Sequence, residues 1–146
     1  MRRFFPSREM NQNREEFSRW FRQAGFDLEA ANVGFKSGSF EWACFQAQQA
    51  VEKALKAVLF LHGKRSVFSH SVHKLVQELV KIDPKFKAMV PAKKLDTFFI
   101  PTRYPNGLPD SIPHEFYDEE DAKFCVNCSR KVLKFLKRYV DPSPNS

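Results

Sequence analysis

Apolar residues recur every three or four positions along most of this chain, which is the spacing of amphipathic helices. The first series follows a capping signal, Asn13 with Glu16 three residues later, and predicts a long helix that ends in the turn at residues 36–39. The apolar positions of this series are Phe17, Trp20, Phe21, Ala24, Leu28, Ala31 and Phe35. We expect this face to pack against the rest of the protein.

A second helix is predicted from about Ser39 to His62, and it is the most apolar segment of the chain. A stripe of small side chains runs along it, formed by Ala43, Ala47, Ala50 and Ala54. Small side chains allow a neighbouring helix to approach closely, so this segment is the expected centre of the core. Gly63 then supplies a left-handed residue that ends the helix.

The second half of the chain predicts shorter elements before a long last helix. A helix is expected over residues 71–81, and Pro84 ends it. One or two short helical turns follow in 86–100, then a proline-rich loop over 101–113 and a long helix over about 118–140. The sequence therefore predicts an all-α fold, an up-and-down bundle of four main helices plus a short one. Its expected limits are 13–140, between a flexible lead-in (1–12) and a disordered tail (141–146).

Composition and charge indicate where this predicted bundle is located and what it binds. The chain has 146 residues, no apolar run long enough to span a bilayer, and no recognisable signal peptide at its start. Three cysteines, an odd number, favour a reducing compartment, so a cytoplasmic location without membrane contact is expected. The formal net charge of +7 favours anionic partners such as nucleotides or nucleic acid.

Two motifs resemble those of a known family. The segment 45–80 reads FQAQQAVEKALKAVLFLHGKRSVFSHSVHKLVQELV, and residues 102–105 read TRYP. Both are similar to motifs of the HEPN domains, and within that family the likeness is to the branch that closes sacsin, a giant chaperone-like protein. This resemblance implies a helical bundle that forms a homodimer, binds nucleotide phosphates in a basic cavity and, through a parent protein, works with an Hsp70-type chaperone system.

The proline-rich loop carries the first candidate ligand contacts, Arg103 and Tyr104. Each proline fixes a backbone angle, so a stiff loop would hold an arginine ready to bind phosphate and a tyrosine ready to stack. Five further residues could supply charge, namely Lys56, Lys64, Arg65, His70 and His73. We therefore expect a non-catalytic module, not an enzyme, that binds GTP or ATP through these residues and uses no metal or cofactor.

Two alternatives stay open. Arg65 and His70 have the R-x4-H spacing of HEPN ribonucleases, in which the histidine is the base for a ribose 2′-hydroxyl and the arginine holds the phosphate. However, this pair lies between the second and third predicted helices, and the nuclease motif belongs to a later helix. The other alternative is an interaction module without a ligand. The C-x2-C of Cys125 and Cys128 lacks further zinc ligands nearby, so buried thiols are expected there.

Overall fold

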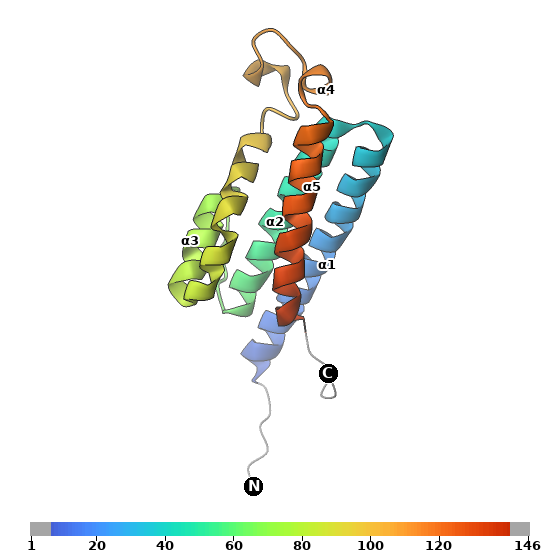
Figure 1. Ribbon diagram of the computed structural model, residues 1–146. Coiled ribbons are helices and arrows are strands. Elements are labelled where there is room, and N and C mark those ends of the chain that lie inside the picture. The colour runs from blue at the N-terminus through green and yellow to red at the C-terminus, as the bar shows by residue number, and fades with distance from the viewer. Residues whose placement is uncertain (1–6, 141–146) are drawn as a thin grey trace.

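The computed structural model describes residues 7–140, which form a bundle of helices (Figure 1). The predicted all-α fold is confirmed. The elements in chain order are α1 (Arg8–Ser37), α2 (Phe40–Leu61), α3 (Val72–Ile82), the 3₁₀ helix η1 (Pro84–Phe98), η2 (Pro105–Gly107), α4 (Pro113–Phe116), α5 (Glu119–Leu136) and η3 (Lys137–Tyr139). None of the helices in this range is long and apolar enough to cross a membrane.

Helix α1 begins at Arg8 and therefore earlier than the predicted start at Asn13. The hydroxyl oxygen of Ser7 accepts a hydrogen bond from the backbone N–H of Met10, which caps a helix end that the sequence did not indicate. The helix ends at Gly38, whose φ of 84° lies in the left-handed region that favours glycine. The predicted lead-in is thus partly helical, and the predicted tail lies outside the described residues.

Helix α2 is the centre of the core, as its alanine stripe predicted. It packs against α1 over most of its length and also contacts α3, α5 and η1. The residues of the stripe are completely buried, and Gly63 takes a left-handed conformation after the helix end. Several polar side chains of α2 are buried as well: Glu41, Gln48, Glu52 and Lys56. These residues are the first sign of a functional site.

Helix α3 and the 3₁₀ helix η1 run side by side at one edge of the bundle (Figure 1). The sequence predicted only one or two short turns in the region of η1, whereas the structure has a 15-residue helix. Pro84 stands at its start and Pro91 within it, and each lacks a backbone N–H donor. Proline is well tolerated at a helix start, but Pro91 disfavours a regular α-helix through this segment, which takes the 3₁₀ form.

The proline-rich loop crosses one end of the bundle between η1 and α5, at the top of Figure 1. Thr102 is buried, and its hydroxyl donates to the carbonyl oxygen of Phe98 at 2.6 Å, which anchors the start of the loop. Helix α5 then begins with a capping box, in which Asp118 and Asp121 each accept from the other's backbone N–H. Both ends of the loop are therefore fixed.

Candidate functional site

The site is built on a buried ion pair of α2. Glu52 and Lys56 lie one helical turn apart, their side chains are almost fully buried, and their charged atoms are 3.8 Å apart. A buried charge costs free energy unless it is paired, and each residue here is the counter-charge of the other. Lys56 Nζ also lies 5.8 Å from the ring centre of Trp20 on α1. Lys56 is thus enclosed by protein.

His70 extends the ion pair to the protein surface. Its Nδ1 lies 2.9 Å from Glu52 Oε1, and its side chain is 62% exposed, whereas that of Glu52 is 4% exposed. A carboxylate only accepts hydrogen bonds, so Nδ1 is the donor, and Nε2 of the neutral imidazole carries a free lone pair. The backbone carbonyl of His70 accepts from Gln48 Nε2 at 3.3 Å. The histidine is therefore oriented from both its side chain and its backbone.

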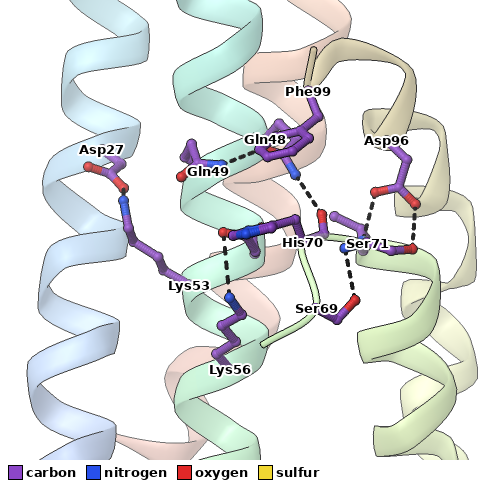
Figure 2. A network of polar contacts seen from close by, with 12 residues as sticks. Asp27, Gln48, Gln49, Lys53, Lys56, Ser69, His70, Ser71, Asp96 and Phe99 are labelled. Carbon is purple, nitrogen blue, oxygen red and sulfur yellow. Dashed lines mark hydrogen bonds and ion pairs between the residues drawn. The ribbon is translucent and has the colours of Figure 1, made fainter. Parts of the chain in front are cut away.

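Figure 2 shows His70 at the centre of a series of polar contacts that joins α2 to η1. The imidazole stacks on the ring of Phe99, with ring centres 5.1 Å apart and planes 19° apart. One turn earlier, Asp96 accepts hydrogen bonds from the backbone N–H groups of Val72 and His73 at 2.7 and 3.1 Å. Asp96 therefore already occupies the N-terminus of α3, which is closed to a phosphate group.

The guanidinium of Arg103 and the imidazole of His70 both contact the ring of Phe99. Its guanidinium carbon is 4.6 Å from the ring centre of Phe99 and 4.4 Å from that of Phe45, and its Nε donates to the carbonyl of Phe99 at 2.9 Å. Within residues 7–140 no carboxylate lies within ion-pair distance of Arg103, so its remaining N–H donors are available to an anion.

The surface beside this histidine is slightly hollowed. A depression of about 250 Å³ is lined by His70, Ser71, Asp96 and Phe99. An oriented imidazole can take up a proton, and an unpaired guanidinium can stabilise negative charge. No group of three His, Cys, Asp or Glu side chains in the described part of the chain is arranged to hold a metal ion.

The structure separates the seven predicted ligand residues into several places. Arg103 and Tyr104 are adjacent, with the arginine 5.4 Å from the tyrosine ring centre, and Phe99 links Arg103 to His70. Arg65 is elsewhere: it donates to Asn13 at 2.6 Å at the start of α1. Sequence spacing alone had grouped Arg65 with His70.

The remaining two predicted residues line other surfaces. Lys64 lines a groove between the loop at 64–69 and α3. His73 lines a separate apolar groove between α3 and η1, together with Lys81 and Lys87. They do not share one basic cavity with Arg103.

A second histidine, His114, contacts a buried glutamate at the start of α2 in the same way that His70 contacts Glu52. Both carboxylate oxygens of the buried Glu41 lie within 3.1 Å of His114 Nδ1, and His114 is exposed. This contact joins α4 to α2. Unlike His70, His114 makes no ring contact with Phe99 and so does not share the aromatic ring on which Arg103 lies.

Sequence reasoning did not include Glu52, Phe99 and Asp96 in the site. Glu52 had a detectable signal, because it is an acidic residue in the most apolar helix of the chain, where a buried charge needs a partner. Phe99 and Asp96 had no such signal, since their roles depend on how η1 packs beside the start of α3.

Comparisons with known proteins agree with this fold. The profile of the HEPN domain family matches residues 17–139. A curated protein of Methanocaldococcus jannaschii, "Putative toxin MJ1304", is 31% identical over 131 residues, covering 83% of this chain and 86% of its own. The crystal structure of TT1696 from Thermus thermophilus has 32% identity and a TM-score of 0.78, covering 84% of this chain and 96% of its own. That of ST0689, an archaeal HEPN homologue, has 32% identity and a TM-score of 0.70, covering 86% and 98%.

These findings correct one expectation and leave others as predictions. The expectation that the chain is not an enzyme is contradicted by its relative with a toxin name and by its family, in which ribonucleases are common. The likeness to the sacsin branch, nucleotide binding, homodimer formation, the chaperone partner and the cytoplasmic location stay predictions. The match of the family profile over most of the chain is decisive for identity: this chain belongs to the HEPN domain family.

Proposed function

We propose that the protein is a metal-independent ribonuclease whose active site is formed by His70 and Arg103. The observation that carries this proposal is the contact between exposed His70 and buried Glu52 at 2.9 Å, which engages Nδ1 of the imidazole and leaves Nε2 as the basic nitrogen. A base held in one orientation by a buried acid is a recurring arrangement in catalysis. Membership of the HEPN family, and the toxin name of a relative, support the same reading.

The reaction needs only groups that these residues supply. His70 Nε2 takes the proton of a ribose 2′-hydroxyl, and the 2′ oxygen forms a bond to the adjacent phosphorus. The bond from phosphorus to the 5′ oxygen of the next nucleotide breaks, and that oxygen takes a proton from water. The products are a 2′,3′-cyclic phosphate and a 5′-hydroxyl, with no net oxidation or reduction. His70 afterwards returns its proton to solvent.

Arg103 stabilises the charge that develops on the phosphate during this reaction. Its planar guanidinium carries more N–H donors than the single one used by the Phe99 carbonyl, and its stacking on Phe45 and Phe99 limits its motion. A donor that is already ordered loses little entropy when the phosphate binds. Arg103 therefore takes the role that the R-x4-H spacing had suggested for Arg65.

The test is cleavage of a fluorescent single-stranded RNA in excess EDTA. Wild-type protein is expected to cut, and the His70→Asn variant is expected to be inactive, because asparagine can still donate to Glu52 but cannot accept the hydroxyl proton. Arg65→Ala is the matched control and is expected to retain activity. Equal cleavage by wild type and His70→Asn would refute the assignment, as would loss of activity in Arg65→Ala but not in Arg103→Ala.

A further inference from the structure

The loop that carries His70 also forms one wall of a groove that the reaction above does not use. This groove has a volume of about 310 Å³ and lies between residues 64–69 and α3. Its floor includes the buried side chains of Leu59 and Leu75, and its rim includes Lys64, Lys74 and Phe68. A mostly apolar hollow with a few polar groups at its rim is the usual form of a small-ligand site.

Phe68 is unusually placed for a phenylalanine. It is 82% exposed, more than any other large apolar side chain in residues 7–140, and it lies two residues before His70. Its ring contacts no other aromatic ring in the described part of the chain. An exposed aromatic ring beside cationic side chains provides a flat surface on which an unpaired base can stack.

The charge of the groove suits a polyanion. Lys64 and Lys74 form no ion pair with any carboxylate in the described part of the chain. The acidic residue in the lining, Glu78, lies 3.2 Å from Lys81, so its charge is already balanced. The hydroxyl groups of Ser66 and Ser69 add hydrogen-bonding capacity at the rim.

The groove is also close to the proposed reaction centre. Figure 2 shows the side chains of Ser69 and His70 turned to opposite sides of the extended backbone, Ser69 toward α3 and His70 toward α2. An RNA strand that crosses this segment therefore meets the imidazole on one side and the groove on the other. One nucleotide can contact His70 while its neighbour reaches Phe68.

We propose that this groove is a subsite for the unpaired base of the nucleotide next to the bond that is cut. The base stacks on Phe68, while Lys64 and Lys74 bind the neighbouring phosphates. This inference rests on the proposed ribonuclease function and specifies its substrate, since a base held in a duplex cannot enter the groove. The protein therefore selects single-stranded over paired RNA.

The test is the binding of a short fluorescein-labelled single-stranded oligonucleotide with 2′-O-methyl riboses, which lacks the nucleophilic hydroxyl and cannot be cut. Fluorescence anisotropy is expected to show a Kd about tenfold or more above the wild-type value for Phe68→Ala. The Kd of Phe68→Tyr is expected to stay near the wild-type value. Lys74→Gln is expected to weaken binding and to reduce its dependence on salt. A blunt duplex, formed by the same oligonucleotide and its full complement, is expected to bind much less well than the single strand.

Phe26→Ala is the matched control for these variants. Phe26 is also well exposed and lines a larger cationic hollow on α1, about 460 Å³, with Arg19 and Lys53. Those two cations are already paired with Glu16 and Asp27, so Arg22 is the one lining cation without an ion pair in the described chain, against two in the groove beside Phe68. The proposal predicts unchanged binding in Phe26→Ala. Weakened binding in Phe26→Ala with normal binding in Phe68→Ala would overturn it, as would equal affinity for paired and unpaired RNA.

The outcomes separate this inference from the ribonuclease proposal. Phe68-dependent binding without cleavage of ordinary RNA would support the subsite and contradict the enzyme. If cleavage depends on His70, and wild type and Phe68→Ala bind and cut RNA equally well, the result would support the enzyme and overturn the subsite. Absence of binding by the wild-type protein would overturn the subsite as well.

Discussion

His70 and Glu52 contact each other across the boundary between solvent and core. Their 2.9 Å contact joins a side chain that is mostly exposed to one that is almost fully buried. The Glu52 carboxylate is balanced on its other side by Lys56, so the histidine is oriented by a charged group that cannot itself move toward solvent. The proposed chemistry depends on this arrangement.

The first prediction concerns the buried ion pair. Glu52→Leu is expected to lower the free energy of unfolding by about 3–5 kcal/mol, because it leaves Lys56 buried without a partner. The double variant Glu52→Leu/Lys56→Met is expected to recover most of that stability, since two apolar residues of similar size replace the pair. Urea unfolding measures both values.

Cleavage is expected to respond differently from stability. Neither variant can orient His70, so both are expected to cut RNA roughly 100-fold more slowly than wild type. If the stable double variant cuts at the wild-type rate, the Glu52 contact has no role in orienting the base.

The second prediction concerns the planar guanidinium of Arg103. Lysine keeps the charge but loses the fork of N–H donors and the stacking on Phe45 and Phe99. Arg103→Lys is therefore expected to lower kcat/KM by about tenfold or more with little change in the melting temperature.

Arg138 is a close structural control for Arg103. Its Nε also donates to a backbone carbonyl, that of Phe135 at 3.1 Å, and its guanidinium carbon is 3.8 Å from that residue's ring centre. Arg138→Lys is expected to leave cleavage unchanged. Similar losses in the two variants would mean that the loss is not specific to Arg103 and would count against its place in the active site.

The third prediction concerns Asp96, which holds the start of α3 beside η1. Asp96→Ala removes the acceptor for the N–H groups of Val72 and His73, so a loss of about 0.5–2 kcal/mol in stability is expected. The segment bearing His70 is also loosened, and we expect cleavage to fall. Asp83 caps η1 by accepting from Lys85 N–H at 3.0 Å, far along the chain from His70. Asp83→Ala is expected to cost some stability but to preserve cleavage; equal activity losses would count against a positioning role for Asp96.

The fourth prediction concerns the cysteines of α5. A hydrogen bond with Cys44, together with burial, raises the pKa of Cys125, and burial raises the pKa of Cys128. Both groups are therefore uncharged thiols at neutral pH and are expected to react slowly with a disulfide reagent until urea unfolds the protein. Rapid labelling of two or more thiols in the native protein would contradict this.

The same pKa shift of Cys125 predicts how stability changes with pH. A group with a raised folded-state pKa contributes stability that is fully present below its unfolded-state pKa, about 8.5 for a thiol, and is lost as the pH rises through the folded-state value. The difference in unfolding free energy between wild type and Cys125→Ala is therefore expected to shrink from pH 7 to pH 10. A difference that is constant or grows would contradict the shift.

More of the fold than of the site could be predicted from the sequence. The alanine stripe of α2 and Gly63 are local signals, and each led to the observed element. The length of the 3₁₀ helix η1 was underestimated, because its prolines and the weak periodicity of its apolar residues hide the helical pattern. The start of α1 was missed because Ser7, and not Asn13, caps the helix.

The site depends on contacts between segments that are distant in sequence. His70 was singled out from its position, but its orienting acid lies 18 residues earlier, on α2. Arg65, five residues before His70, turns to α1, while Arg103 reaches the ring of Phe99 from a different loop. Spacing along the chain cannot distinguish these two arginines, because tertiary packing decides which one is close.

The most direct test of the central claim compares an RNA with the same RNA carrying one 2′-deoxy nucleotide at the main cleavage position, both in EDTA. The account predicts that wild-type protein cuts the RNA to give a 2′,3′-cyclic phosphate and a 5′-hydroxyl, and that the single 2′-deoxy substitution abolishes cleavage at that bond. His70→Asn is expected to cut neither substrate. Cleavage of the 2′-deoxy bond, or products with a 5′-phosphate, would contradict a mechanism in which His70 activates the 2′-hydroxyl.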